Sequence, residues 1–592
     1  MSSDDAKVTV STRSEATGPV TGRRYHLVLV GDLGTAGRLA GLTPTDADGF
    51  ADLMRQARPQ AAIALADPLG RGDDWELPLA FESLKAFEPA GLLGQVPAGR
   101  WRLGLREKLI ARRRGEIGPD DLERTLRAAA AGDASLAWLL EPAAPTPSAQ
   151  APQPPAGGSI LDFVDEPDDA ARVAADVERL AAQAGDKERR ISGDEARRIE
   201  TLLARVDDEL ARITGAVLNH PDVRRLETVW RGVRFVIDRV DFRAGVRLAV
   251  LDAPRDEAVD RLAEHVILPA YDGAIETPGM VVFDYPVANT PVDLAMLDEA
   301  AQQAASLPVP IVFPVESAFF NIKGWRLLKN LPNLAGLTDS FAFAKWRSLR
   351  DQPHARCLVP VIGRFMLRPP WDGRRAGEGF AYRQAPGKIS DLLWAHGHLA
   401  MGVCAARSFA RHGWPTRMFG AEAGRIEDLP VVDNPNDPGN PWGPGDLVLP
   451  DRRLDEPPEI GMNLLLSVRG KDFCILLGGV SAARPVRRAD AGPRQAALEI
   501  SLPYQQFAAV VSDYLSRAVS ELRGSSAEQI QQKLLFGLAN LLGIREMGEM
   551  DAIQVGVAPH PDDPGRTLVQ LRLAPPARIV PGGLHMEFGL TI

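Results

Sequence analysis

Histidine is the residue type in this chain with the most varied chemistry, because its ring can accept a proton or bind a metal near neutral pH. The chain has nine histidines, and only His396 and His398 are spaced closely enough to suggest a metal pair. Residues 390–411 are predicted to form a helix, on which side chains two positions apart point in different directions. We therefore interpret both as structural histidines rather than as metal ligands.

The other candidate motifs do not add up to a catalytic site. Residues 31–34, GDLG, follow a predicted strand as phosphate-binding loops do, but the third glycine and the lysine of such loops are missing, so we predict a turn. Cys357 has no partner histidine and is predicted to be a small buried residue. The HExxH, CxxC and GxSxG motifs and the P-loop motif do not occur. The sequence thus predicts no catalytic residue, no metal and no cofactor. One enzymatic alternative stays open, a site dispersed over the loops of residues 360–460.

Composition and charge exclude further classes of protein. The 592 residues are 45% hydrophobic and 25% charged, as in globular proteins, and they suffice for several domains. The net charge of −10 disfavours nucleic acid as a partner, because neutralising phosphates needs a basic surface. No apolar run approaches the roughly 18 residues of a membrane span, and residues 1–10 do not resemble a signal peptide. With three scattered cysteines, we expect a cytoplasmic protein without disulfides and without membrane insertion.

A proline-rich hinge divides the chain. Residues 143–158 contain five prolines and neither charged nor aromatic residues, so they cannot bury enough apolar surface to offset the loss of chain entropy. We therefore predict a segment of residues 1–142, a linker of residues 143–158 and a segment of residues 159–592.

The first segment has the pattern of a mixed α/β structure. Alternating polar and apolar residues predict strands at 8–11 and 24–30. A helix is predicted at 46–57, then a short strand at 61–65 and a further helix at 120–140.

The second segment begins with helices and continues with mixed structure. Ser192 and Glu195 form a capping-box pattern ahead of a long amphipathic stripe, and a further helix is predicted over residues 223–237. Strands and helices are predicted beyond it, at 246–251, 280–284 and 293–305, in addition to the helix at 390–411. We divide this segment into outer helices (159–215), central domains (216–550) and a C-terminal β arm (551–592).

The C-terminus carries the clearest strand pattern. Strands are predicted at 553–557 and 567–573, and the last nine residues alternate regularly. A strand at the end of a chain has a free edge, which suits pairing with a neighbouring chain. We predict that both ends of the chain form strands that pair between copies. The residues assigned to these arms are Val8, Val10, Leu584, Met586, Phe588, Leu590 and Ile592.

Several motifs of the second segment resemble, in the same order, those of the large sheath subunit of type VI secretion systems (the TssC/VipB family). The most specific match runs from Asn219-His220-Pro221 through Leu226-Glu227 to Trp230-Arg231-Gly232. Departures from the family pattern include Gly363 and Trp371. The further matches are residues 280–286, 363–371, 412–414, Gly420, Gly424, 428–430, 451–453, 460–462 and 502–504.

The first segment resembles the small sheath subunit of the same systems (TssB/VipA). The matching features are the two predicted strands, residues 32–34 and the run of residues 81–89, in which Ala86 departs from the family pattern. This match is shorter than the match to the large subunit. Together the two resemblances suggest a natural fusion of both subunits.

The resemblance implies a mixed α/β fold of the contractile phage-tail-sheath kind, with an outer helical domain and terminal strand arms. It implies a non-enzymatic sheath protomer that assembles with itself into a helical polymer around an inner tube of the Hcp kind, on a baseplate. The sheath of a phage-tail-like injection device without ATPase recycling is the alternative.

Residues 159–166 resemble the short helix that the family's recycling ATPase, an AAA+ protein of the ClpV kind, grips in the large subunit. The residues implied as contacts are Ile160, Leu161, Phe163 and Val164. The alternative is that this stretch docks the hinge onto the outer helices.

Overall fold

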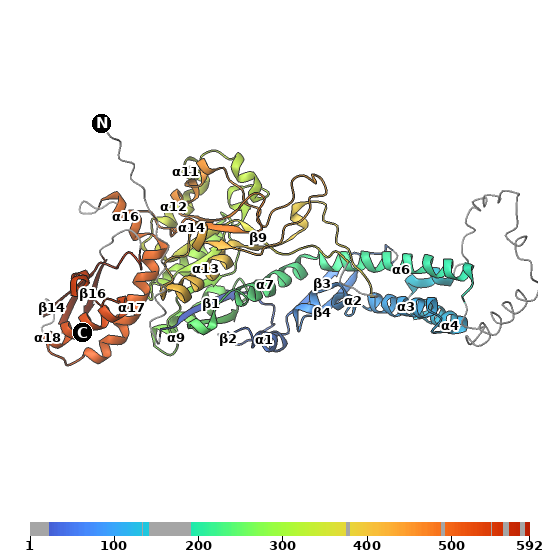
Figure 1. Ribbon diagram of the computed structural model, residues 1–592, viewed down its shortest axis with the longest axis horizontal. Coiled ribbons are helices and arrows are strands. Elements are labelled where there is room, and N and C mark those ends of the chain that lie inside the picture. Colours follow the sequence, from blue (N-terminus) through green and yellow to red (C-terminus); the bar gives the residue numbers. More distant parts are fainter. Residues whose placement is uncertain are drawn as a thin grey trace, which may run out of the picture.

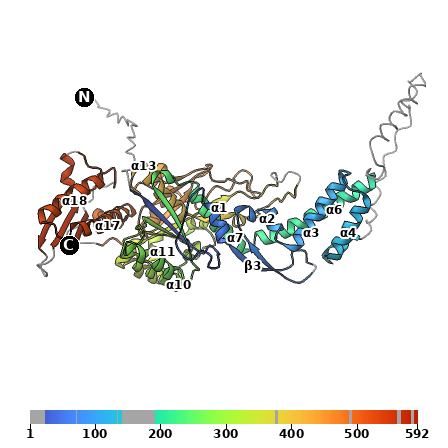
Figure 2. The same ribbon diagram turned by 90° about the horizontal axis from the view of Figure 1, so that it is seen from below.

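The computed structural model describes residues 23–140 and 191–592, apart from residues 71, 133, 374–378, 487–491, 546, 560–566, 581–585 and 592. The described part is elongated and mixes helices and strands (Figure 1). A central sheet with helices on both faces forms the body, a helical extension projects from one end, and a C-terminal unit lies at the other end in both views (Figure 2).

The central sheet has nine strands in the order β11-β13-β12-β8-β7-β6-β1-β5-β2. Its middle strands β8, β7, β6, β1 and β5 run parallel, and β1 lies between β6 and β5. The strand from the first segment is therefore an inner strand of a sheet built mostly by the second segment. The strands are β1 (Tyr25–Gly31), β2 (Thr43–Thr45), β5 (Val246–Asp252), β6 (Met280–Phe283), β7 (Ile311–Pro314), β8 (Leu358–Ile362), β11 (Arg425–Ile426), β12 (Asn463–Ser467) and β13 (Cys474–Leu477).

Buried apolar residues on both sides of β1 explain why this strand lies inside the sheet. Leu27 and Leu29 belong to one hydrophobic cluster, whereas Val28 and Val30 belong to another on the opposite face. Inner strands of parallel sheets are covered on both faces and therefore consist of nearly continuous hydrophobic runs.

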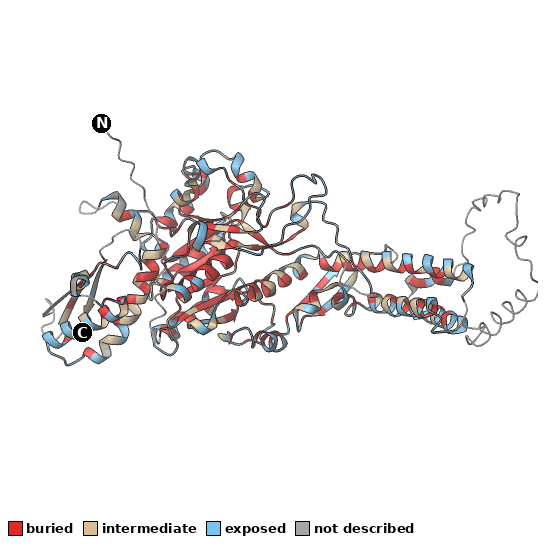
Figure 3. Ribbon diagram, viewed as in Figure 1, coloured by how far each residue is buried: buried red, intermediate tan, exposed pale blue. Residues whose placement is uncertain are grey.

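Two sets of helices cover the two faces of the sheet. Helices α7 (Pro221–Ile237) and α13 (Gly397–His412) contribute to the cluster that contains Leu27 and Leu29. Helices α8 (Ala258–Leu262), α10 (Pro291–Ala305) and α12 (Ala344–Arg350) contribute to the opposite cluster. Figure 3 shows that buried residues concentrate in this part of the molecule.

The helical extension combines helices from both segments. Helix α6 (Gly193–Leu218) packs against α3 (Pro97–Arg113), and α4 (Pro119–Gly132) packs against α3 (Figure 1). The Ser192 hydroxyl caps α6 by accepting a hydrogen bond from the Glu195 backbone N–H at 3.1 Å, as the sequence predicts. The Glu195 carboxylate binds Arg112.

The C-terminal unit packs two long helices against a three-stranded antiparallel sheet of order β14-β15-β16. These helices are α17 (Leu502–Leu522) and α18 (Ala527–Leu542). The strands are β14 (Ile553–Pro559), β15 (Thr567–Leu573) and β16 (Met586–Thr591).

Short elements complete the described chain. The remaining strands form two two-stranded sheets, β3 (Gln60–Leu65) with β4 (Trp75–Ala80) and β9 (Arg364–Arg368) with β10 (Leu393–His396). The remaining α-helices are α1 (Phe50–Ala57), α2 (Pro89–Leu93), α9 (Leu268–Tyr271), α11 (Leu334–Thr338), α14 (Gly420–Ala423), α15 (Glu456–Glu459) and α16 (Pro493–Glu499).

Two helix predictions are wrong in part. The predicted helix 390–411 contains a strand, β10, followed by α13, so His396 ends the strand and His398 lies in the first turn of the helix. The predicted helix 120–140 ends at Gly132, and a 3₁₀ segment (Ala134–Leu140) follows. Apolar spacing alone does not separate these cases, because short buried strands and buried helices share long apolar runs.

The segment boundaries stay a prediction, because the two segments share one sheet and residues 143–158 lie outside the described residues. No helix within the described ranges is long and apolar enough to cross a membrane.

Candidate functional site at the junction of the two segments

The first junction between the segments is the insertion of β1 into the central sheet. From Tyr25 to Gly31, β1 pairs in parallel with Val246–Asp252 of β5, and Leu27–Val30 pair with Met280–Phe283 of β6. Hydrogen bonds therefore run along both edges of a strand whose side chains are buried on both faces. This pairing binds the two segments together, and both edges of β1 are occupied.

The turn after β1 is held by carboxylates of both segments. The Leu33 backbone N–H donates to the Asp252 carboxylate at 2.8 Å, and the Thr35 hydroxyl donates to the same carboxylate. The Gly34 N–H donates to Asp32 at 3.1 Å. Gly34 has a φ of +68°, and a Cβ there would lie 2.5 Å from Leu226 of α7. The predicted turn is confirmed, and two of its N–H groups point at carboxylates rather than at a phosphate.

The tryptophan of the predicted signature connects the two segments directly. The Trp230 ring is fully buried in α7, and its Nε1–H donates to the Leu33 carbonyl oxygen at 3.0 Å. On the neighbouring turn of α7, Arg225 forms an ion pair with Asp32 at 3.0 Å. The signature therefore marks the helix face on which the turn of the first segment lies.

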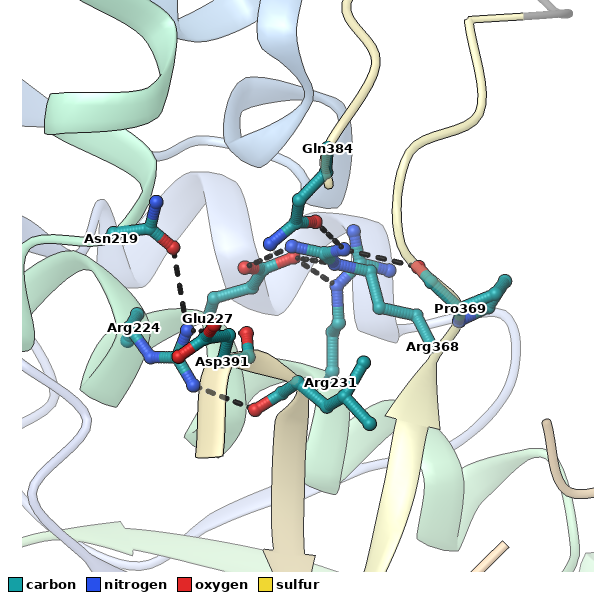
Figure 4. Close-up of polar contacts among 9 residues, drawn as sticks. Asn219, Arg224, Glu227, Arg231, Arg368, Pro369, Gln384 and Asp391 are labelled. Carbon is teal, nitrogen blue, oxygen red and sulfur yellow. Dashed lines mark hydrogen bonds and ion pairs between the residues drawn. The ribbon is translucent and has the colours of Figure 1, made fainter. Parts of the chain in front are cut away.

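A cluster of charges surrounds the buried Glu227 of α7 (Figure 4). Its carboxylate accepts from Arg368 Nε at 2.7 Å and Nη2 at 3.2 Å, and from Arg231 Nε at 2.7 Å. Burial by itself would raise the pKa of Glu227, but the two guanidinium groups hold the pKa below its ordinary value. The carboxylate is therefore a fixed anion that binds β9 to α7.

Two arginines of this cluster hold loop backbone in place. Arg224 donates to the carbonyl oxygens of Asp391 at 2.9 Å and Leu392 at 2.6 Å, and Arg368 donates to that of Pro369 at 3.1 Å (Figure 4). These bonds fasten both ends of the connection between β9 and β10. The arrangement is that of a structural clamp.

The second junction lies in the helical extension, where α3 and α6 pack apolar side chains into one buried cluster and add ion pairs to it. Arg102 of α3 binds Glu209 of α6 at 2.8 Å, with exposed fractions of 0% and 1% for the two side chains. Further along the same helix pair, Arg106 Nε lies 2.7 Å from an Asp207 carboxylate oxygen.

The pair between Arg112 and Glu195 closes the far end of this junction. The Arg112 guanidinium donates two hydrogen bonds to the Glu195 carboxylate, at 2.8 and 3.0 Å. The hydrogen bonds from Arg112 lower the pKa of Glu195 and raise the pKa of Arg112. Such two-pronged contacts fix geometry as well as charge.

The candidate histidines lie near the carboxyl end of β6, an inner strand of the central sheet. His398 is fully buried, and its Nε2 lies 3.0 Å from Asp284 Oδ1. His396 is 6.3 Å from the His398 ring, and burial lowers the pKa of His396 to about 3. Within the described ranges, no three His, Cys, Asp or Glu side chains group so as to hold a metal ion. Cys357 is buried, and burial raises its pKa to about 11.

The residues assigned to the strand arms are only partly described. Met586, Phe588 and Leu590 share the face of β16 that packs on the C-terminal core, and Met586 is buried. β16 pairs with β15 of its own chain, and within the described residues its other edge has no partner. Pairing with a neighbouring copy stays a prediction. The arm residues Val8, Val10, Leu584 and Ile592, and the ATPase-segment residues Ile160, Leu161, Phe163 and Val164, lie outside the described residues.

Sequence analysis missed the ionic residues of the helical extension. Arg102 and Arg112 share one face of α3 with the buried Leu105 and Leu109. Charged residues at buried positions of an apolar stripe indicate buried partners. That signal was present in the sequence, but it names no partner.

Comparison with known proteins identifies the family. Residues 200–483 match the VipB family model, described as the tail sheath N-terminal domain, and residues 40–143 match the type VI secretion system VipA family model. The chain therefore combines a VipA-like and a VipB-like sheath domain, consistent with a fusion of the two type VI secretion sheath components. Members of this family are structural proteins that assemble with themselves into a helical polymer.

One relative and one solved structure illustrate the similarity. The chain is 27% identical over 374 residues to the type VI secretion system sheath protein TssC1 of Pseudomonas aeruginosa, covering 60% of this chain and 75% of that protein. The contracted helical sheath of the anti-feeding prophage matches with a TM-score of 0.33 and 9% identity. That match covers 58% of this chain and 78% of the sheath chain.

Proposed function

We propose that this sheath protein is a complete single-chain protomer of a cytoplasmic contractile sheath, which surrounds an inner tube and ejects it by contracting. The observation that carries the proposal is the position of β1, an inner strand of the sheet that the second segment builds. A protomer of this kind needs one copy of each component. Joining them in one chain fixes that ratio and raises their effective concentration to about millimolar.

A mechanical role, without catalysis, fits the use of polar groups at the junctions. Glu227, Asp252 and Glu209 are engaged by arginines or by backbone and hydroxyl donors. The region proposed as an enzymatic alternative, residues 360–460, contributes β9, β10 and α13 to the fold. His398 of its histidine pair is fully buried, and His396 is 12% exposed.

Assembly is proposed to use the free edge of β16 together with the strand predicted near Val8 and Val10. An unpaired strand edge offers a row of backbone donors and acceptors to another chain. Contacts of this head-to-tail kind generate open filaments when the rotation does not close a ring.

Electron microscopy of the purified full chain tests this function. We expect helical tubes from the intact protein and none from a variant that lacks residues 584–592. The deletion variant should keep its central fold, measured as an unchanged melting transition of the main body. Normal tubes from the deletion variant would reject the arm assignment, and the absence of tubes from the intact protein under all assembly conditions would reject the sheath function.

The finer partners belong to the same proposal: an inner tube of the Hcp kind, a baseplate and an AAA+ ATPase of the ClpV kind. Leu161→Asp combined with Phe163→Asp should abolish ATPase binding in a pull-down while tubes still form. If the double substitution prevented assembly instead, the segment would be structural and the recycling role would be wrong. Retained ATPase binding would also reject the assignment.

A further inference from the structure

An apolar groove of about 740 Å³ runs between α3 and α4 in the helical extension. Leu105 and Ala129 form its buried floor, and the Trp101 ring lies beside them with 47% of its surface exposed. A half-exposed tryptophan above an apolar floor is a common feature of sites that accept a large apolar side chain.

Two glycines border the groove. A Cβ on Gly104 in the middle of α3 would meet nothing within 4 Å, so the missing side chain leaves open space. A Cβ on Gly132 at the end of α4 would lie 3.0 Å from the Trp101 ring, so this glycine lets the ring lie against the helix. Glycine inside a helix is destabilising relative to alanine, so each of these glycines lowers the stability of its helix.

The rim of the groove is basic. Arg100 and Lys108 of α3 and Arg124 of α4 line it. Arg124 pairs with Asp121 at 3.2 Å on the exposed surface, whereas Arg100 and Lys108 have no ion pair with any described residue. An occupant of this groove should therefore combine apolar side chains with carboxylates.

The chain itself contains a segment of that chemistry close by. Residues 160–169 contain Ile160, Leu161, Phe163 and Val164, five acidic residues and no basic residue. The described chain stops at Leu140, eleven residues beyond Ala129 of the groove, and resumes at Ile191. About twenty residues of linker reach roughly 25 Å on average, which suffices to return to α4.

We infer that residues 160–169 bind in the α3–α4 groove of their own chain. Phe163 and Leu161 fill the space beside Trp101, and the acidic side chains face Arg100, Lys108 and Arg124. Because the segment is tethered, its effective concentration at the groove is about millimolar, so a weak contact suffices to keep it bound. This docking would cover the residues proposed above as ATPase contacts, but it holds whether or not an ATPase exists.

Thiol protection in the full chain tests the inference. The native cysteines Cys357, Cys404 and Cys474 are buried, so an engineered surface thiol reacts first with a maleimide. In a Gly104→Cys variant, replacing Ile160, Leu161, Phe163 and Val164 by serine should raise the labelling rate at least tenfold. A matched control, Glu107→Cys, places the thiol at an exposed position of α3 outside the groove lining and should label at one rate in both backgrounds.

Charge reversal on the rim provides a second measurement. Lys108→Glu combined with Arg100→Glu should raise the labelling rate of the thiol at position 104 and leave that of the thiol at position 107 unchanged. High salt should have the same effect in the unreversed chain, because it screens the attraction. Equal labelling rates at position 104 with and without the four serines would overturn the inference. Protection that increases with protein concentration would assign the groove to a segment of a second copy and would also overturn it.

Discussion

The two segments of this protein meet at two junctions of different character. In the central sheet, β1 adds backbone hydrogen bonds along both edges and apolar side chains to both cores. In the helical extension, α3 and α6 add arginine–carboxylate pairs to their apolar packing, and the pair of Arg102 with Glu209 is fully buried.

The difference suggests a division of labour between stability and alignment. Burial of apolar surface is non-directional and contributes roughly 25 cal/mol per Å². Because β1 buries side chains on both faces of the sheet, we expect the sheet junction to provide most of the binding free energy. In a buried ion pair, the attraction between the charges roughly offsets the cost of removing them from water. The pair nevertheless forms in only one geometry. Long helices that could slide along each other are fixed in register by such pairs.

Separating the segments gives the largest effect that we predict. Residues 1–142 and 159–592, produced as two chains, should bind each other, because the sheet junction does not need the linker. Leu29→Asp should abolish this binding, since it places a charge in the buried apolar cluster on one face of the sheet. Co-purification on a tagged large fragment measures the outcome.

Two controls belong to this experiment. Leu29→Ala should weaken the complex by about 2–5 kcal/mol rather than abolish it. Arg247→Ala, at an exposed position of neighbouring β5, should change stability by less than about 0.5 kcal/mol. Fragments that stay apart when mixed would contradict the sheet junction altogether.

The ionic junction should respond differently to single and double substitution. Arg102→Ala leaves the Glu209 carboxylate buried without this partner and should cost about 3–5 kcal/mol. Arg102→Met combined with Glu209→Leu should be close to neutral in melting temperature, because apolar side chains replace both charges. If the double variant lost as much as the single one, the pair would be a major source of stability, and the division of labour would be wrong.

The hydrogen bond between Trp230 and Leu33 should contribute less. Trp230→Phe keeps most of the apolar volume but leaves the Leu33 carbonyl without its 3.0 Å donor, at a cost of about 1–3 kcal/mol. Thermal unfolding measures the change. Val233→Ala, a fully buried position one turn further along α7, serves as a control for packing loss without loss of a hydrogen bond.

Lowering the pH should change the stability contributions of the two junctions in opposite directions. This effect is the smallest that we predict. The pKa of Glu195 is lowered by its hydrogen bonds from Arg112, so the stability that it adds is present above an unfolded pKa of about 4.3 and is lost as pH falls through the folded value. Burial raises the pKa of Asp252, so its contribution is present at low pH and is lost as pH rises through the raised value.

Melting temperatures between pH 3 and 7 separate these contributions. The advantage of the wild type over Glu195→Gln, about 1 kcal/mol or less, should disappear at the acid end. The melting temperature of the wild type relative to that of Asp252→Asn should increase as the pH falls toward 3. Parallel pH profiles for both variants would contradict the opposite pKa shifts.

Local patterns in the sequence determined many individual elements of this protein. Alternation predicted β1, β14, β15 and the last strand, and apolar spacing with a Ser192 cap predicted α6. These predictions succeed because strand and helix periodicity and capping are properties of neighbouring residues. The family signature around Trp230 was also legible, because it is contiguous.

Only the tertiary structure decided which elements meet. No local pattern places β1 between β5 and β6, which follow more than 200 residues later. Likewise, no local pattern pairs Glu227 with Arg368, 141 positions later. The same holds for His396 and His398, which lie near the carboxyl end of β6 although residues 390–411 were predicted to form one helix. The type of a buried polar residue indicates that it needs a partner. Burial and long-range packing determine which residue that partner is, and they depend on the whole chain.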